Sequence, residues 1–313
     1  LDARVSLKHI TILAFVVAFG LLLRVIHWSP SADGDEARYI NHAYALAQGT
    51  IPEYFDGAIA VRIPYLAYLA SWGAMFGYTT PVLQSSGLLT YVLAALLLWI
   101  MTRMLYDAQA GHVAAVLFST LPIHVVLSTH ALTDDLGLVF ALASVLVWII
   151  ASSRSDLLGS TLLFAVAGLL AGVATGIRQT FFLLGIILPV GSYFSGVPLT
   201  RCVLATFVFA VSALCYFVAE SIAFWAWLGD PVFRLNHDVF HTVADSARVA
   251  PVVTPRAPMS LLQKTFAFRG YLSSLLPSGK FGFVPILTAL ALADRISQRD
   301  KRASVPIAFI VIL

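Results

Sequence analysis

Charge and cysteine are scarce in this sequence. Of 313 residues only 11% are charged and two are cysteines. Cys202 and Cys215 both lie inside apolar runs, so the sequence supports neither a disulfide framework nor a cysteine metal site. The net charge is only +3, and no basic cluster is interleaved with aromatic residues, which excludes nucleic acid as an expected partner. No ATP-binding motif that could power transport is present.

Apolar residues are abundant and occur in long runs. They make up 59% of the chain, and a mean hydropathy of +0.88 lies far outside the range of soluble domains. A spanning helix needs roughly 20 mostly apolar residues. Candidate spans lie at 9–28, 80–102, 111–129, 135–152, 157–175, 179–195, 202–228 and 281–296, and another begins at 305. The first run carries Arg24 and no convincing cleavage site follows it, so we interpret it as an uncleaved helix. The sequence predicts an all-α polytopic membrane protein.

Lysine and arginine in the short connections predict the orientation of this bundle. Basic residues precede the first span, occupy alternate turns and follow the eighth span: Arg4, Lys8, Arg103, Arg154, Arg201 and the run DRISQRDKR. These connections, and with them the N-terminus, are predicted to be cytoplasmic. The long segments 29–79 and 229–280, with short turns near 130–135 and 176–179, then lie on the outer face.

The first outer segment predicts two short helices. Residues 35–48 favour a helix with Ile40, Ala43, Tyr44 and Ala47 on one side and Gly49 as its stop signal. The aromatic-rich stretch from Arg62 to Gly77 is about 16 residues long, which suits a helix lying at the interface better than one that crosses the bilayer. We therefore expect a two-helix shelf on the membrane surface.

Ionisable residues gather on the same outer face, where charges tend to serve function. They are Asp33, Asp35, Glu36, Arg38, Arg62, His130, Asp134, Asp135, Arg178, His237, Asp238 and His241. Carboxylates can act as general bases, and arginines can hold a phosphate bidentately and stabilise it as it departs. The combination predicts transfer of a group from a lipid phosphate whose tail stays in hydrocarbon.

Structural roles compete with this interpretation at several positions. Asp33 and Glu36 have the spacing of a capping box, and the dipole of the same helix favours an acid at Asp35. Arg62 and Arg178 could extend to lipid headgroups.

Metal binding is a further alternative. Asp33-Gly34-Asp35 has the D-x-D form that holds a divalent metal in nucleotide-sugar transferases. His237 and His241 have the i, i+4 spacing of metal ligands or of interfacial helix residues. His130 could pair with Asp134 in a turn.

Four motifs carry a resemblance to a known family. Asp35-Glu36-Ala37-Arg38-Tyr39 is similar to the outer acidic motif of GT-C glycosyltransferases that use polyprenyl-phosphate sugars. These include lipid A aminoarabinose transferases, protein O-mannosyltransferases and bacterial lipopolysaccharide-modifying sugar transferases. RIPYLAYL resembles their basic-plus-proline segment, with Arg62 where a lysine is more usual.

The other two motifs come from later in the chain. ALTDD resembles the second acidic motif; the match falls on Asp134, and Asp135 stands where proline commonly follows. GVATGIRQT is similar to the Gly-rich end of helix five that precedes a basic residue, here Arg178. The resemblance covers about residues 9 to 300.

The resemblance implies a GT-C-type helix bundle with two interfacial helices in its first outer loop. Residues 1–313 would form the transmembrane catalytic domain, incomplete at its C-terminus because VPIAFIVIL is about half a spanning length. It would lie in the plasma membrane, a bacterial inner membrane, with its active site outside, and serve the cell envelope or lipopolysaccharide.

The family mechanism implies roles for individual residues. Asp35 would deprotonate or orient an acceptor that attacks the anomeric carbon with inversion. Arg62 and Arg178 would hold the phosphate leaving group, Asp134 would position acceptor or sugar, and Glu36 would support them.

Further implied contacts complete the candidate site. Arg38, Tyr39, Asp135, His130 and His237 are candidate donor or substrate contacts. No cofactor is certain, and a divalent metal at Asp33, Asp35 and His237 is left open. The expected partners are a polyprenyl-phosphate sugar, membrane lipids and a lipid, glycan or protein acceptor.

Two other function classes fit the composition. A secondary transporter would favour internal repeats and charges near the midplane, and a non-catalytic scaffold subunit would need no converging acids and bases. Convergence of Asp35, Asp134, Arg62 and Arg178 around one cavity that opens to both bilayer and outer water would distinguish the transferase.

Overall fold

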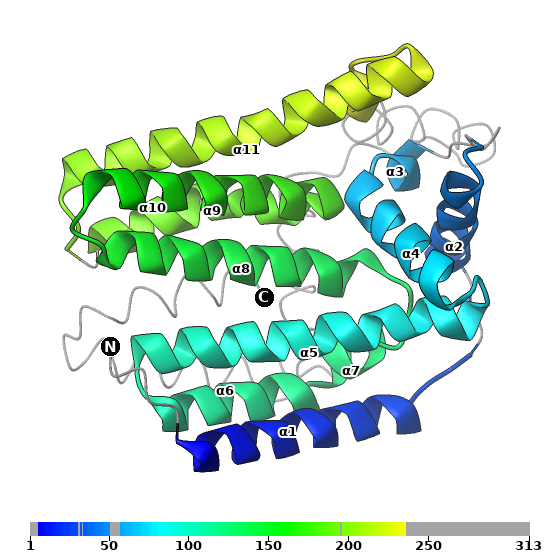
Figure 1. The fold of residues 1–313 in the computed structure, drawn as a ribbon, viewed down its shortest axis with the longest axis horizontal. Helices are drawn as coiled ribbons and strands as arrows, with labels where there is room; N and C mark the ends of the chain where they lie inside the picture. Colours follow the sequence, from blue (N-terminus) through cyan, green and yellow to red (C-terminus); the bar gives the residue numbers. More distant parts are fainter. Residues whose placement is uncertain (1–5, 31, 33, 51–56, 195, 236–313) are drawn as a thin grey trace, which may run out of the picture.

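Five long apolar helices form the bundle. The computed structural model describes residues 6–30, 32, 34–50, 57–194 and 196–235, which contain helices and no strand. Within these ranges, the helices long and apolar enough to cross a membrane are α1 (Leu7–Ile26), α5 (Thr80–Leu105), α8 (Thr133–Ser153), α9 (Leu157–Ile177) and α11 (Leu199–Leu228). They run roughly parallel to the long axis of the molecule (Figure 1). The prediction of an all-α polytopic membrane protein is confirmed.

Two predicted spans are interrupted rather than single continuous helices. The run 111–129 is divided into α6 (Ala108–Thr120) and α7 (Pro122–Leu127), because Leu121 is extended and a residue before proline disfavours the helical region. The run 179–195 begins as a 3-10 helix, η1 (Gln179–Leu183), and continues as α10 (Leu184–Phe194), which contains Pro189 and is by itself shorter than a full spanning helix. The predicted spans at 281–296 and from 305 lie outside the described residues.

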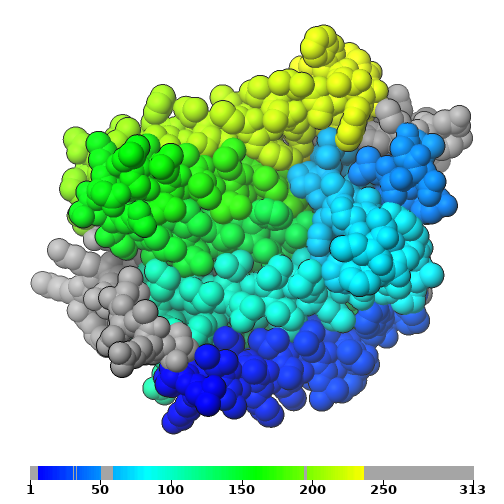
Figure 2. All heavy atoms as spheres, in the orientation of Figure 1, coloured from blue at the N-terminus to red at the C-terminus, as the bar shows by residue number. Residues whose placement is uncertain are grey.

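The short helices of the first loop lie at one end of the bundle. They are α2 (Gly34–Ala47), α3 (Gly57–Ala60) and α4 (Ile63–Phe76), drawn in blue to cyan in Figure 1. Figure 2 shows their atoms covering that end of the molecule. The predicted pair of short helices is confirmed, and Gly49 beyond α2 has φ +67. That these helices lie at a bilayer surface stays a prediction.

The buried face of α2 differs from the predicted one. Glu36, Tyr39, His42 and Ala43 are buried, whereas Tyr44 is half exposed. The apolar pattern misplaced the face because two of the buried side chains are polar and form hydrogen bonds, so they are tolerated inside.

Small residues let the central helices approach closely. A Cβ added at Gly168 of α9 would lie 2.2 Å from the backbone oxygen of Phe209 in α11. Close backbone approach at small residues is a main source of helix packing in membranes. The α8, α9 and α11 helices pack through Trp148, Phe164 and Phe209.

Arg24 ties the first helix to the bundle without a carboxylate partner within hydrogen-bonding distance among the described residues. Its guanidinium donates to Ser128 Oγ at 2.6 Å and to the carbonyl oxygens of Gly20, Ser119 and His124. It also stacks on Tyr91, with 3.4 Å from guanidinium carbon to ring centroid. Because a buried cation needs such partners, these contacts fix α1 against α5, α6 and α7.

The close contact at Gly168 leads to a stability prediction. We expect Gly168→Ala to lower the free energy of unfolding by about 1–3 kcal/mol, because the methyl group meets backbone rather than a movable side chain. Gly191→Ala is the matched control, since a Cβ there has no neighbour within 4 Å, and alanine is the better helix former. Equilibrium unfolding in mixed micelles measures both, and equal effects would contradict the packing argument.

Candidate functional site

Arg62 joins three elements at the shelf end of the bundle. It precedes α4, and its Nη1 donates to the Tyr39 hydroxyl at 2.5 Å and to Thr133 Oγ1 at 2.9 Å. Tyr39 lies on α2 and Thr133 begins α8. The Arg62 guanidinium is thereby held at a fixed place between α2, α4 and α8.

Asp134 and Arg178 form an ion pair beside this contact. Asp134 lies in the first turn of α8 and Arg178 directly follows α9. Their side chains are 24% and 42% exposed, so the pair can be reached from solvent. The structure therefore joins two of the residues that the family motifs singled out.

The Tyr39 hydroxyl, which Arg62 contacts, responds to several of these charges. Burial raises the pKa of Tyr39, the positive charge of Arg62 opposes that rise, and the bond with Thr133 opposes it as well. Asp35 raises and Arg178 lowers the same pKa through weaker electrostatic effects. Burial and the charge of Arg62 also lower the pKa of Arg178. The predicted residues Asp35, Arg62 and Arg178 therefore act on one site.

Asp35 is the exposed acid of the group. Its carboxylate is 70% exposed and lies 3.8 Å from the Arg38 guanidinium, one turn along α2. Arg38 is itself 57% exposed. A carboxylate in this position is accessible to an incoming acceptor.

Glu36, the next residue, is buried and holds the shelf to the bundle. Its carboxylate accepts from the backbone N–H of Ala131 at 2.5 Å, from His130 Nδ1 at 2.8 Å and from Gln84 Nε2 at 3.1 Å. These bonds connect α2 to α5 and to the turn before α8. They account for Glu36 without the capping box, whose other half, Asp33, lies outside the described residues.

In the turn before α8, one predicted pairing is wrong. His130, considered as a partner of Asp134, instead bonds to Glu36. Asp135 is 3% exposed and lies 3.6 Å from Nδ1 of His124. Neither of its oxygens has a hydrogen-bond partner among the described residues. Asp134 and Asp135 therefore face different surroundings, Asp134 toward Arg178 and Asp135 toward the interior.

Arg234 is a residue that sequence reasoning missed. Glu220 of α11 is a buried acid for which the sequence suggested no partner. In the structure Arg234 binds both oxygens of this carboxylate, and the Tyr216 hydroxyl donates to it at 2.7 Å. Gly229, at φ +71, reverses the chain after α11 and lets Arg234 return to Glu220. The need of a buried acid for a basic partner was the signal available in the sequence.

A metal site cannot be assembled from what is described. Among those residues no three His, Cys, Asp or Glu side chains come together as ligands. Of the residues predicted for a metal only Asp35 is described, because Asp33 and His237 lie outside, as do Asp238 and His241. The divalent metal considered at Asp33, Asp35 and His237 stays a prediction.

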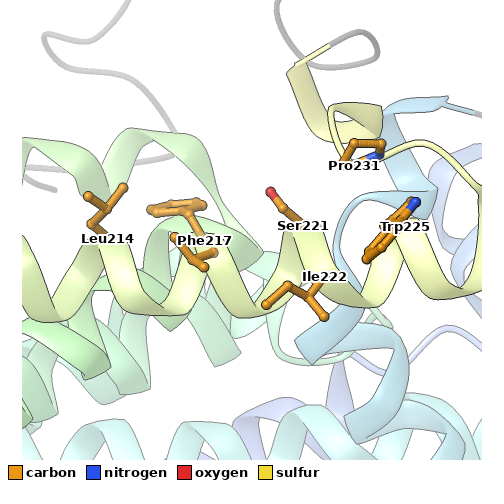
Figure 3. Close-up of a pocket in the computed structure, with 7 residues that line it drawn as sticks. Leu214, Phe217, Ser221, Ile222, Trp225 and Pro231 are labelled. Atoms are coloured by element: carbon orange, nitrogen blue, oxygen red, sulfur yellow. The ribbon is translucent and has the colours of Figure 1, made fainter.

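The two pockets described lie away from this cluster. One is an open apolar groove of about 250 Å³ on α11, lined by Leu214, Phe217, Val218, Ser221, Ile222, Trp225 and Pro231. Figure 3 shows its side chains along the outer side of that helix. The other lies near Ser155, Thr200 and Arg201. The predicted cavity around Asp35, Asp134, Arg62 and Arg178 stays a prediction.

The bundle and its shelf define an all-α polytopic membrane protein. No family model and no curated protein sequence matches the chain. Solved structures with the same arrangement are oligosaccharyltransferases of Archaeoglobus fulgidus. One is AglB in complex with an inhibitory peptide and a dolichol-phosphate, with 13% identity and a TM-score of 0.62 over 97% of this chain and 46% of its own.

Two further structures agree. The complex with Zn and sulfate has 15% identity and a TM-score of 0.59, over 96% of this chain and 48% of its own. The apo form has 16% identity and a TM-score of 0.56, over 97% and 46%. The chain thus spans about half the length of these structures. The likeness confirms the GT-C resemblance at the level of the fold.

The contrast between Asp35 and Glu36 leads to a second stability prediction. Glu36→Gln should lower the free energy of unfolding by about 1.5–3 kcal/mol, because an amide cannot accept the same three bonds as the carboxylate. Asp35→Asn, its exposed neighbour, should change it by less than about 0.5 kcal/mol. Unfolding in mixed micelles compares the two. A stable Glu36→Gln variant would contradict the tie between α2 and α8.

Proposed function

We propose that this protein transfers a sugar or glycan from a polyprenyl-phosphate donor to an acceptor at the shelf end of its bundle. The observation that carries the proposal is that two arginines from separate elements meet adjacent residues at the start of α8, since Arg62 donates to Thr133 and Arg178 pairs with Asp134. The dolichol-phosphate in the AglB complex supports a lipid phosphate as the donor class. The inhibitory peptide there supports a peptide among the candidate acceptors.

The two arginines would receive the phosphate. A guanidinium has five N–H donors, more than Tyr39 and Thr133 take from Arg62, so each arginine can add a phosphate oxygen to its contacts. Two cations beside the leaving group stabilise the charge that develops as the bond to the sugar breaks. The ion pair with Asp134 would keep Arg178 oriented before the donor binds.

Asp35 would serve the acceptor. The acceptor oxygen or nitrogen forms a bond to the anomeric carbon, the bond from that carbon to the phosphate oxygen breaks, and configuration inverts. The acceptor proton passes to the Asp35 carboxylate and then to water, and the polyprenyl phosphate leaves as an anion. Positioning of the reactants and stabilisation of the leaving group would supply most of the rate enhancement.

The distribution of basic residues supports an extracytoplasmic site. Arg103, Arg154 and Arg201 lie at or next to the ends of α5, α8 and α11, at the end of the bundle opposite the shelf (Figure 1). Short connections rich in arginine favour the cytoplasmic side. A cell-envelope acceptor, with lipopolysaccharide as one case, follows from the same orientation. A transporter or scaffold would not require the charges to meet at one end.

Substitution of Asp35 tests the proposed chemistry. Asp35→Asn should lower kcat by about 100- to 10,000-fold if the carboxylate accepts the acceptor proton. The assay measures transfer in membranes with a panel of polyprenyl-phosphate sugars. Asp156→Asn, an exposed acid at the opposite end of the bundle, is the control and should retain activity. Full transfer by Asp35→Asn would remove this residue from the mechanism.

Substitution of the arginines tests donor binding. Arg62→Gln and Arg178→Gln should each lower kcat/KM for the donor by about 100-fold, because one stabilising cation at the leaving group is lost. Arg154→Gln, half exposed at the far end of the bundle, should have no effect. The same variants should lose inhibition by free polyprenyl phosphate. Unchanged inhibition would place the phosphate elsewhere.

A further inference from the structure

The Arg234 guanidinium binds backbone groups close to both of the arginines that are proposed to bind phosphate. Nη2 of Arg234 donates to the carbonyl oxygens of Val61 at 2.5 Å and Gly176 at 2.9 Å. Val61 directly precedes Arg62, and Gly176 is two residues before Arg178. Arg234 therefore contacts the backbone near Arg62 and near Arg178, and these contacts leave both guanidinium groups available.

These two carbonyls need a partner at this position. Gly176 lies in the last turn of α9 and Val61 follows the end of α3. Carbonyl oxygens at the C-terminal end of a helix have no N–H donor within that helix. Both residues are buried, so unsatisfied oxygens would be costly. A cation at a helix C-terminus is also favoured by the helix dipole.

The Arg234 side chain is itself held in place. Glu220, whose side chain is only 4% exposed, binds it through both carboxylate oxygens, and Tyr216 donates to Glu220. Gly176 packs directly on this group, since a Cβ there would lie 2.2 Å from the Tyr216 hydroxyl. Nε and Nη2 bind the two carboxylate oxygens, and Nη2 shares its two N–H groups among one of these oxygens and the two carbonyls. A lysine ammonium is a compact point charge and does not reproduce this planar fork.

We propose that Arg234, oriented by Glu220 and Tyr216, is a positioning residue that fixes Arg62 and Arg178 relative to one another so that they bind one phosphate. The inference rests on the proposed function and names no contact of Arg234 with the donor. Geometry matters here, because displacement of a binding group by about 1 Å can cost on the order of 100-fold in rate.

The first measurement is independent of transfer. Hydrogen exchange of purified protein in lipid nanodiscs should show faster exchange in Arg234→Lys at two separate segments. The exchange is followed at two backbone amides. The amide of Arg62 donates to the carbonyl oxygen of Ile59, and the amide of Arg178 donates to that of Ala174. Arg201→Lys is the matched control, because Arg201 donates to helix-end carbonyls of Ala151 and Arg154 at the opposite end. Unchanged exchange at either segment would overturn the proposal.

The second measurement is binding of a short-chain polyprenyl phosphate, with the unphosphorylated polyprenol as reference. Arg234→Lys should weaken binding of the phosphate by about 10- to 100-fold and leave polyprenol binding unchanged. In the Arg178→Gln background the same change should cost less than about twofold, because residues that act through one another are not additive. Fully additive losses would show a general structural role and overturn the proposal.

A milder variant, Glu220→Gln, keeps the proposal testable if Arg234→Lys does not fold. Glu220→Gln keeps the side-chain shape and removes the charge that orients Arg234, so it should reproduce the faster exchange and the weaker phosphate binding to a smaller degree. Wild-type protein that binds polyprenyl phosphate no better than polyprenol would overturn the proposed function. The exchange experiment would still decide whether Arg234 holds the two segments.

Discussion

Pairing of buried charges is the constraint on which this structure depends. In a bundle of apolar helices an unpaired charge is costly, and three buried charges take partners from other elements. Glu36 takes three donors from α5 and the turn before α8, and Glu220 takes Arg234 from beyond α11. Arg24 takes carbonyls and a hydroxyl from α1, α6, α7 and the residue that follows α7. These contacts fix the relative positions of the helix ends.

The same contacts bring the site together. The short connection 154–156 makes α8 and α9 antiparallel neighbours, so Asp134 at the start of one lies beside Arg178 just after the other. Glu36 then holds α2 against this edge, and Arg62 closes it through Tyr39 and Thr133. Polar groups that stabilise the fold therefore stand directly behind the groups proposed to bind donor and acceptor.

Adjacent acids have different surroundings because successive helical residues point about 100° apart. Asp35 is exposed whereas Glu36 is buried, and Asp134 meets Arg178 whereas Asp135 lies near His124. Each of these two pairs thus has one member that is accessible to solvent and one that is buried in the bundle. Replacing both acids of a pair in one variant would therefore change the stability and the proposed chemistry at the same time.

The sequence by itself determined the membrane class, the five long helices, the short helices of the first loop and the gathering of acids and arginines on one side, since these follow from hydrophobic length and local signals. It did not determine the breaks at Leu121 and Gln179, the buried face of α2 or the division between Asp35 and Glu36. Only the tertiary structure decided the pairings of Glu36 with His130 and of Glu220 with Arg234. Such pairings depend on which helices become neighbours, and no local pattern carries that information.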